Sequence, residues 1–327
     1  MSKPSVLLTR RIPEDGLRLL KESCSVVMWN DDSEAPCDWV LENISEVDGL
    51  LCLLTDNIDS AVLAAASRLR VVSTLAVGFD NISIIDCTNR GIPVGHTPGV
   101  LTETTADFAF ALMMSAARRV GEAAAYVKQG HWKTWSPTAF LGHDLHGATL
   151  GIIGLGRIGR ALAKRAHGFA MKVLACRSSS SSSCQKVDCD DVEYVDLHTL
   201  LAGSDFVSLH VPLTNETKQL IGLAELRSMK TTAILINTAR GAVVDSQALY
   251  EALVQGEIAY AALDVTDPEP LPSDDPLLTL SNCLIVPHIA SASIATRAKM
   301  AVMAAENLLA GLSGARLPYC ANPEVYG

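Results

Sequence analysis

Long apolar runs, an excess of positive charge and closely spaced cysteine pairs are all missing from this chain of 327 residues. No apolar stretch approaches the ~20 residues of a membrane-spanning helix, so we expect no contact with a membrane. Met1-Ser-Lys-Pro is not followed by the apolar run of a secretory signal, which favours the cytoplasm. The formal net charge of −10 argues against binding to nucleic acid, because that binding needs clustered cations.

The positions of the cysteines and the content of aromatic and apolar residues bear on metal binding and on the number of cores. The nine cysteines are scattered through apolar segments such as Leu51-Cys52-Leu53, and no two of them form a CxxC pair. We therefore expect reduced core cysteines and no metal site. Aromatic residues make up only 5% of the chain, whereas apolar residues make up 49%. The apolar content suffices for substantial hydrophobic cores, and the length of the chain favours two domains, each with its own core.

Short apolar runs alternate with helical patterns along the whole chain. This alternation is typical of parallel sheets that are covered by helices. It predicts an α/β protein with two doubly wound parallel-sheet (Rossmann-like) domains and an interdomain cleft. The expected strands are 5–9, 25–29, 49–54, 71–75 and 92–95 in a first series, and 149–153, 171–176, 192–195, 206–211, 233–237, 259–264 and 283–286 in a second.

The second series opens on a glycine motif. The strand that begins at Thr149 leads directly into Gly154-x-Gly156-x-x-Gly159 and then into a helical pattern. Gly154 permits a tight turn, Gly156 lets the backbone approach a pyrophosphate, and Gly159 lets the helix pack closely on the sheet. An ordinary glycine-rich turn is the alternative, but the flanking strand and helix favour a dinucleotide site.

Two helical patterns suggest where the domains meet. An alanine-rich pattern from Thr102 to Val120 follows the first series, and another from Ala295 to Leu312 follows the second. We expect the first helix to cross between the lobes and the last to return to the first lobe. The dinucleotide-binding domain is then expected at 101–289, inserted into a discontinuous substrate-binding domain of residues 1–100 and 290–327.

The residue after the second strand of the glycine-loop domain bears on the choice of cofactor. Arg177 follows Met171–Cys176, where an acidic residue would accept from the ribose 2′-hydroxyl of NAD(H). A guanidinium instead offers several donors to a 2′-phosphate, and Ser178 adds a hydroxyl. We therefore expect a preference for NADP(H) that does not exclude NAD(H). A solvated arginine at a strand end is the alternative.

Three polar residues follow later strands of the same domain. Arg240, Glu269 and His288 each lie at or beyond a strand end, on the edge where open parallel sheets bind ligands. A guanidinium suits a carboxylate, and a carboxylate beside an imidazole favours its protonated form. Taken singly, each also has a structural explanation: a capping or phosphate-binding arginine, a solvated glutamate and a hydrogen-bonded loop histidine.

Four motifs occur in one order: Gly-Leu-Gly-Arg-Ile-Gly (154–159), Asn-Thr-Ala-Arg-Gly (237–241), Asp-Val-Thr-Asp-Pro-Glu-Pro (264–270) and Pro-His-Ile-Ala-Ser (287–291). With them the chain resembles the D-isomer specific 2-hydroxyacid dehydrogenases over nearly its whole length. Arg177 and the Leu-Pro that follows Pro270 make it most similar to the glyoxylate and hydroxypyruvate reductases of that family.

The resemblance implies roles for individual residues. His288 matches the acid/base of the family, Glu269 its carboxylate partner and Arg240 the cation that orients the substrate. Val77 and Gly78 match a loop whose backbone N–H groups bind the substrate carboxylate, beside Arg240 and His288. The implied dinucleotide contacts are Thr105, Gly154, Gly156, Arg157, Ile158, Gly159, Arg177, Ser178, Pro212, Thr238, Asp264 and Ala290. Ala290 stands where the family usually has glycine, which puts the substrate preference in question.

The implied activity is the NADPH-dependent reduction of small 2-oxo acids, glyoxylate to glycolate and hydroxypyruvate to D-glycerate, with His288 as proton donor. Two alternatives stay open: a corepressor-type protein that senses dinucleotides on the same fold, and a related dehydrogenase with another substrate, such as phosphoglycerate or formate. The paired tryptophans of Gly130-His-Trp-Lys-Thr-Trp135 fit a subunit interface, and the resemblance implies a homodimer.

Overall fold

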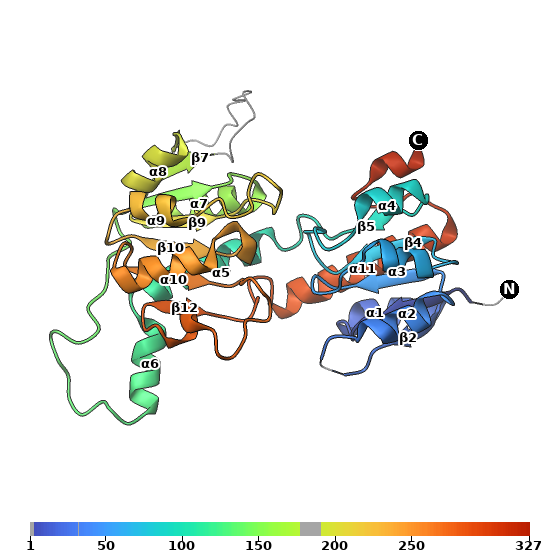
Figure 1. The fold of residues 1–327 in the computed structure, drawn as a ribbon, viewed down its shortest axis with the longest axis horizontal. Coiled ribbons are helices and arrows are strands. Elements are labelled where there is room, and N and C mark those ends of the chain that lie inside the picture. The colour runs from blue at the N-terminus through green and yellow to red at the C-terminus, as the bar shows by residue number, and fades with distance from the viewer. Residues whose placement is uncertain (1–2, 32, 177–190) are drawn as a thin grey trace. The chain divides into compact units, whose positions relative to one another are not determined.

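The computed structural model describes residues 3–31, 33–176 and 191–327. The chain divides into two compact units, Met1–Leu101 with Ala292–Gly327 (unit 1) and Thr102–Ser291 (unit 2). Each unit is built on an all-parallel sheet covered by helices, which confirms the expected fold class of two doubly wound sheets (Figure 1). Among the described residues, no helix combines the length and the apolar character needed to cross a membrane.

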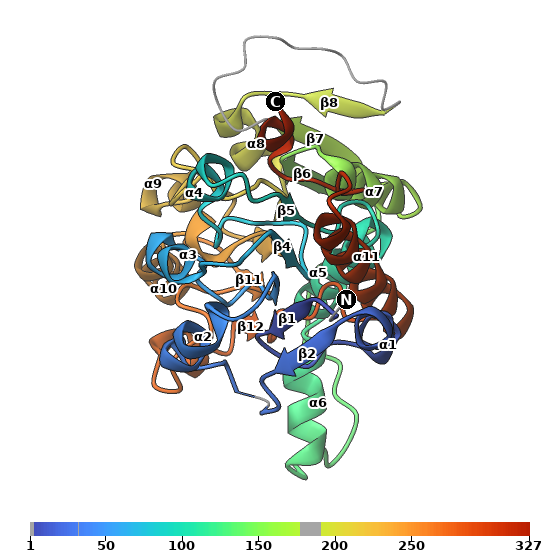
Figure 2. The ribbon, with the colours of Figure 1, turned by 90° about the vertical axis from the view of Figure 1, so that its right-hand side faces the viewer.

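Unit 1 contains a five-stranded sheet in the order β2-β1-β3-β4-β5. Helices α1 and α11 cover one face of this sheet, and α2, α3 and α4 cover the other (Figure 2). The strands are fully buried at Leu50 and Val72, as expected for near-continuous apolar runs between two helical layers. The elements are β1 (Ser5–Leu8), α1 (Glu14–Ser23), β2 (Ser25–Met28), α2 (Cys37–Ile44), β3 (Gly49–Cys52), α3 (Ser60–Ala65), β4 (Val71–Thr74), α4 (Ile84–Asn89), β5 (Val94–Gly95), α11 (Ile294–Ser313) and the 3-10 turn η3 (Pro323–Tyr326).

Unit 2 contains a seven-stranded sheet in the order β12-β11-β10-β9-β6-β7-β8. The order reverses between β6 and β9, and open α/β sheets bind ligands at the carboxyl ends of the strands that flank such a point. The elements are α5 (Thr102–Ala117), α6 (Val120–Lys128), β6 (Thr149–Ile153), α7 (Arg157–His167), β7 (Lys172–Cys176), β8 (Val192–Tyr194), α8 (Leu197–Gly203), β9 (Phe206–Leu209), α9 (Leu223–Ser228), β10 (Ile234–Asn237), η1 (Gly241–Val243), α10 (Ser246–Gln255), β11 (Tyr260–Leu263), η2 (Pro276–Thr279) and β12 (Cys283–Ile285).

The two faces of the unit 2 sheet have separate cores. Ile234 and Ile236 pack with α5 and α7 on one face, whereas Leu235, between them in the sequence, packs with α8, α9 and α10 on the other. This alternation follows from the two-residue period of a strand.

One helix ends earlier than the sequence pattern predicts. The expected helix from Thr102 to Val120 stops at Ala117, and the chain turns at Arg119, whose φ of 51° is left-handed, before α6 begins. The carbonyl of Ala117 accepts a hydrogen bond from the backbone N–H of His143, a residue 26 positions away whose approach the local pattern does not contain. Satisfying this carbonyl outside the helix accounts for the break.

Candidate active site

The glycine motif forms a tight turn between β6 and α7. Gly154 has a φ of 96°, a left-handed conformation that favours glycine. A Cβ on Gly159 would lie 2.5 Å from the carbonyl oxygen of Gly154, so the start of α7 packs directly against the turn. A Cβ on Gly156, by contrast, would meet no atom of residues 3–31, 33–176 or 191–327 within 4 Å. The turn therefore leaves open space in front of the amino end of α7, where its N–H groups can bind a phosphate.

The residues around this turn fit a dinucleotide. Gly156 is the N-cap of α7 and offers no side chain that would compete for the first N–H groups of the helix. Just after β10, the hydroxyl oxygen of Thr238 is buried and has no hydrogen-bond partner among the described residues. A buried polar atom of this kind needs a partner, and a polar group of a bound cofactor would supply one.

The other expected cofactor contacts differ in exposure. Thr105 is buried in α5, Arg157 and Pro212 are exposed, and Ile158 is half-buried. Arg177 and Ser178, on which the expected preference for NADP(H) depends, lie outside the described residues.

Asp264 directly follows β11 and holds the loop that carries His288. Its two carboxylate oxygens accept hydrogen bonds from the backbone N–H groups of Ile289 (2.7 Å) and Ala290 (2.9 Å). The backbone N–H of His288 donates to the carbonyl of Asp264 at 2.9 Å. The pKa of the Asp264 carboxyl is raised, because the effect of burial outweighs the lowering by the two backbone N–H groups and the nearby His288. These three bonds hold His288 in a left-handed backbone conformation with a φ of 52°.

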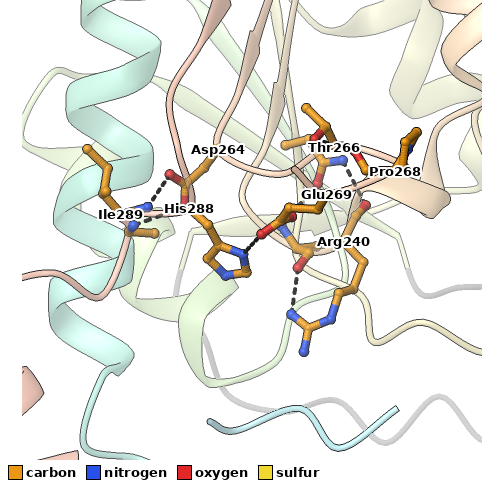
Figure 3. A network of polar contacts seen from close by, with 10 residues as sticks. Arg240, Asp264, Thr266, Pro268, Glu269, His288 and Ile289 are labelled. Carbon is orange, nitrogen blue, oxygen red and sulfur yellow. Dashed lines mark hydrogen bonds and ion pairs between the residues drawn. The ribbon is translucent and has the colours of Figure 1, made fainter. Parts of the chain in front are cut away.

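The side chains of His288 and Glu269 form a hydrogen-bonded pair. The imidazole Nδ1 lies 2.6 Å from Oε1 of Glu269, a short, charge-assisted contact (Figure 3). The two side chains are only 21% and 28% exposed, so solvent screens the pair less than it would on an open surface. A carboxylate that accepts from Nδ1 fixes the orientation of the ring and leaves Nε2 available for a second hydrogen bond.

Arg240 lies in the loop that follows β10. Its Nη1 donates to the carbonyl of Ala239 at 2.9 Å, and its own carbonyl accepts from the side-chain amide of Asn237 at 2.9 Å. Figure 3 shows the guanidinium extending toward the same side of the network as the imidazole of His288. Unit 2 thus brings Arg240, Glu269 and His288 to one edge of its sheet, the edge that also carries the glycine turn.

A titratable group that sequence analysis did not single out lies at the same edge. His210 follows β9, and a Cβ on Gly154 would lie 2.8 Å from the carbonyl carbon of His210. Its Nε2 lies 2.9 Å from the hydroxyl oxygen of Ser208. Burial lowers the pKa of the His210 imidazole to about 4, so the ring is neutral at pH 7. Its only signal in the sequence is its place at a strand end, just before Pro212.

Val77 and Gly78 lie in unit 1, in the loop after β4, and both are half-buried. The carbonyl of Val77 accepts a hydrogen bond from Nδ1 of His96 at 2.9 Å. The ring of Phe79 packs edge-on against that imidazole, with 5.4 Å between the ring centroids. These contacts order the loop whose backbone N–H groups are the expected ligands of the substrate carboxylate.

Comparisons with known proteins agree with this geometry. A family model described as D-isomer specific 2-hydroxyacid dehydrogenase, NAD binding domain, matches residues 110–290. A glyoxylate reductase of Korarchaeum cryptofilum is 53% identical over 99% of this chain and 97% of its own length. A glyoxylate reductase of Thermococcus litoralis is 48% identical over 99% of this chain and 98% of its own.

Solved structures extend the likeness to three dimensions. A protein of Thermus thermophilus has a TM-score of 0.89 at 45% identity and covers 97% of this chain and 99% of its own. The NADPH-dependent glyoxylate/hydroxypyruvate reductase of Sinorhizobium meliloti, in complex with NADP and malonate, has a TM-score of 0.85 at 30% identity, over 99% of this chain and 98% of its own. The chain therefore belongs to the D-isomer specific 2-hydroxyacid dehydrogenase family of oxidoreductases.

Proposed function

We propose that this protein reduces small 2-oxo acids with NADPH, converting glyoxylate to glycolate and hydroxypyruvate to D-glycerate. The observation that carries the proposal is the 2.6 Å pair of His288 and Glu269 at the carboxyl edge of the unit 2 sheet. The glyoxylate reductases that are about half identical to this chain support the substrate class. In this proposal unit 2 binds the dinucleotide, and unit 1 supplies the loop for the substrate carboxylate.

Reduction of a 2-oxo acid needs a hydride at C2 and a proton on the oxygen of the former carbonyl. The nicotinamide, when bound, supplies the hydride. His288 donates the proton, and because Nδ1 is paired with Glu269, the donating atom is Nε2. The carboxylate of Glu269 stabilises the imidazolium before the transfer and holds the ring in one orientation.

Arg240 has two roles in this reaction. Its guanidinium binds the substrate carboxylate in a fixed orientation, and its charge stabilises the oxygen of the reacting carbonyl as that atom becomes negative. The backbone N–H groups of Val77 and Gly78 also bind the substrate carboxylate. Both roles of Arg240 depend on a planar, permanently charged side chain, which is why lysine is not an equivalent replacement.

The preference for NADPH rests on Arg177 and Ser178 in the sequence. It is supported by a solved relative that contains NADP. We expect Arg177→Asp to reverse the preference, because a carboxylate repels the 2′-phosphate and accepts from the 2′-hydroxyl of NADH. The ratio of kcat/KM with NADPH to that with NADH measures this, and an unchanged ratio would remove Arg177 from cofactor selection.

A homodimer is part of the proposal. Apolar side chains are exposed on α6 and on the segment after it, namely Val120, Val127, Trp132, Trp135 and Leu141, which are 52% to 77% exposed. A second copy of the chain would cover them. The mass in solution tests this, and a monomer would contradict it. The expected cytoplasmic location remains a prediction.

The test of the function is a substrate panel in which NADPH consumption is followed by its absorbance. We expect turnover with glyoxylate and hydroxypyruvate. Tight binding of NADPH without turnover of any 2-oxo acid would indicate a dinucleotide-sensing protein instead. Turnover confined to another 2-oxo acid would retain the reaction and change only the substrate.

A further inference from the structure

Gly241 lies directly against the loop that carries Glu269. A Cβ on Gly241 would be 2.0 Å from the carbonyl carbon and oxygen of Thr266 and 2.6 Å from the nitrogen of Asp267. Non-bonded carbon atoms normally stay about 3.5–4.0 Å apart. The obstacle is a peptide bond rather than the end of a flexible side chain, so it cannot be avoided by a change of rotamer.

The reason for glycine here is space and not conformation. Gly241 begins the 3-10 turn η1, and its φ does not lie in the left-handed region. Its backbone conformation therefore suits any L-residue. A methyl group at this position would leave η1 intact but would push the 266–267 peptide away from it. Gly241 thus allows a close approach of two backbones that no larger residue would allow.

The same loop has one internal hydrogen bond and one further attachment, to the start of α10. The hydroxyl of Thr266 donates to the carbonyl of Pro268 at 2.8 Å, and the hydroxyl of Ser246, at the start of α10, donates to the carbonyl of Asp267 at 3.4 Å. The segment from Gly241 to Ser246 therefore supports the loop just before Glu269. The loop in turn presents the Glu269 carboxylate to His288 at 2.6 Å.

We infer that Gly241 is a positioning residue for the Glu269–His288 pair: its missing side chain sets the place of the Glu269 loop, and through it the orientation of the proton donor. The inference rests on the proposed function, in which this pair protonates the substrate. A hydrogen bond of 2.6 Å tolerates little displacement, because it weakens beyond about 3.2 Å. A shift of the loop large enough to seat a methyl group exceeds that margin.

The test compares Gly241→Ala with a matched control, Gly168→Ala, in the NADPH-loaded enzyme with glyoxylate. Gly168 is exposed at the end of α7 in a right-handed helical conformation, and of the described atoms a Cβ there would meet only the carbonyl oxygen of Arg165, at 3.3 Å. For Gly241→Ala we expect kcat to fall about 10- to 100-fold while the KM for glyoxylate and the Kd for NADPH change little. For Gly168→Ala we expect wild-type kinetics.

Two double variants show which neighbour Gly241 acts through. If it acts through Glu269, adding Gly241→Ala to Glu269→Gln should lower kcat by less than about threefold further, because the pair is already broken. Added to Arg240→Lys, the same substitution should retain its full effect. Full additivity with Glu269→Gln, or the loss of the effect only beside Arg240→Lys, would overturn the inference.

If Gly241→Ala does not fold, Thr266→Val tests whether the loop before Glu269 positions the pair. Valine keeps the shape of threonine but removes the hydroxyl bond to Pro268, so a few-fold loss in kcat alone is expected. Wild-type kcat in Thr266→Val beside an unfolded Gly241→Ala would mean that the contact serves stability only, and would overturn the inference. A wild-type enzyme that reduces no 2-oxo acid would instead overturn the proposed function.

Discussion

At the scale of single residues, the site depends on how one histidine is held. His288 has a left-handed backbone, which is uncommon for a residue with a side chain. The Asp264 carboxylate fixes this backbone through the two N–H groups that follow His288, and Glu269 fixes the ring at Nδ1. Backbone and side chain are therefore constrained by separate carboxylates, which is the preorganisation that the proposed proton transfer requires.

Replacing the imidazole should separate catalysis from cofactor binding. We expect His288→Gln to lower kcat about 10²- to 10⁴-fold, because the amide does not donate a proton at neutral pH. The Kd for NADPH, measured by fluorescence, should stay close to the wild-type value. His143→Gln is a matched control, since His143 is exposed and precedes β6 at the opposite edge of the sheet. Unchanged turnover in His288→Gln would remove His288 from the mechanism.

Arg240 should affect binding and turnover together. We expect Arg240→Ala to raise the KM for glyoxylate and to lower kcat, with about a 10²- to 10³-fold loss in kcat/KM, because one cation serves both steps. Steady-state kinetics with saturating NADPH measures both constants. A rise in KM at unchanged kcat would show that Arg240 binds the substrate without stabilising the transition state.

At the scale of elements, the unit of β6, the glycine turn and α7 is the clearest link between local sequence and function. Each glycine of the motif has a different neighbour: Gly154 packs on the chain after β9, Gly159 packs on Gly154, and Gly156 faces open space. Gly154 and Gly159 are needed for the fold, because a side chain on either would collide with protein atoms, whereas the described part of the chain leaves Gly156 free of such a collision.

This difference gives a prediction for Gly156. We expect Gly156→Val to leave the thermal unfolding midpoint nearly unchanged, because a Cβ there has no neighbour within 4 Å in the described structure. The Kd for NADPH should rise at least about tenfold, which corresponds to about 1.4 kcal/mol, because the side chain occupies the space of the pyrophosphate. Calorimetry and cofactor titration measure the two quantities. Wild-type affinity in this variant would place the pyrophosphate elsewhere.

At the scale of the whole molecule, acid stability should depend on His210. Its folded-state pKa, about 4, lies below the value of about 6.5 in the unfolded chain. The unfolded state therefore binds a proton first as the pH falls. The contribution of this histidine to stability is complete above about pH 6.5 and is lost as the pH falls toward 4, with an upper limit of about 3 kcal/mol.

Urea unfolding between pH 4.5 and 7.5 checks this sign. We expect the free energy of unfolding of the wild-type protein to decrease toward acid more steeply than that of His210→Gln, whose amide does not titrate. Comparison with the variant cancels the contributions of the other groups that titrate in this range. Parallel curves for the two proteins would show that His210 does not contribute to the acid sensitivity.

The amino-acid sequence alone determined the α/β class, the parallel strands and the glycine turn, because each depends on neighbours within about one strand and one helix. The order of Arg240, Glu269 and His288 at strand ends also placed them on one sheet edge before any coordinates, since parallel strands end together. The helix expected to run to Val120 was the clearest error, because Ala117 bonds to His143 across a distant loop.

Only the folded structure shows which residues that are far apart in the sequence contact one another. The pairing of His288 with Glu269, the anchoring of residues 289–290 by Asp264 and the packing of Gly241 on Thr266 each join residues that lie 19 to 26 positions apart or belong to different loops. Periodicity and local motifs describe what a segment prefers by itself. Which atoms meet across two loops depends on how closely the backbones approach, and that distance exists only once both cores of unit 2 have packed.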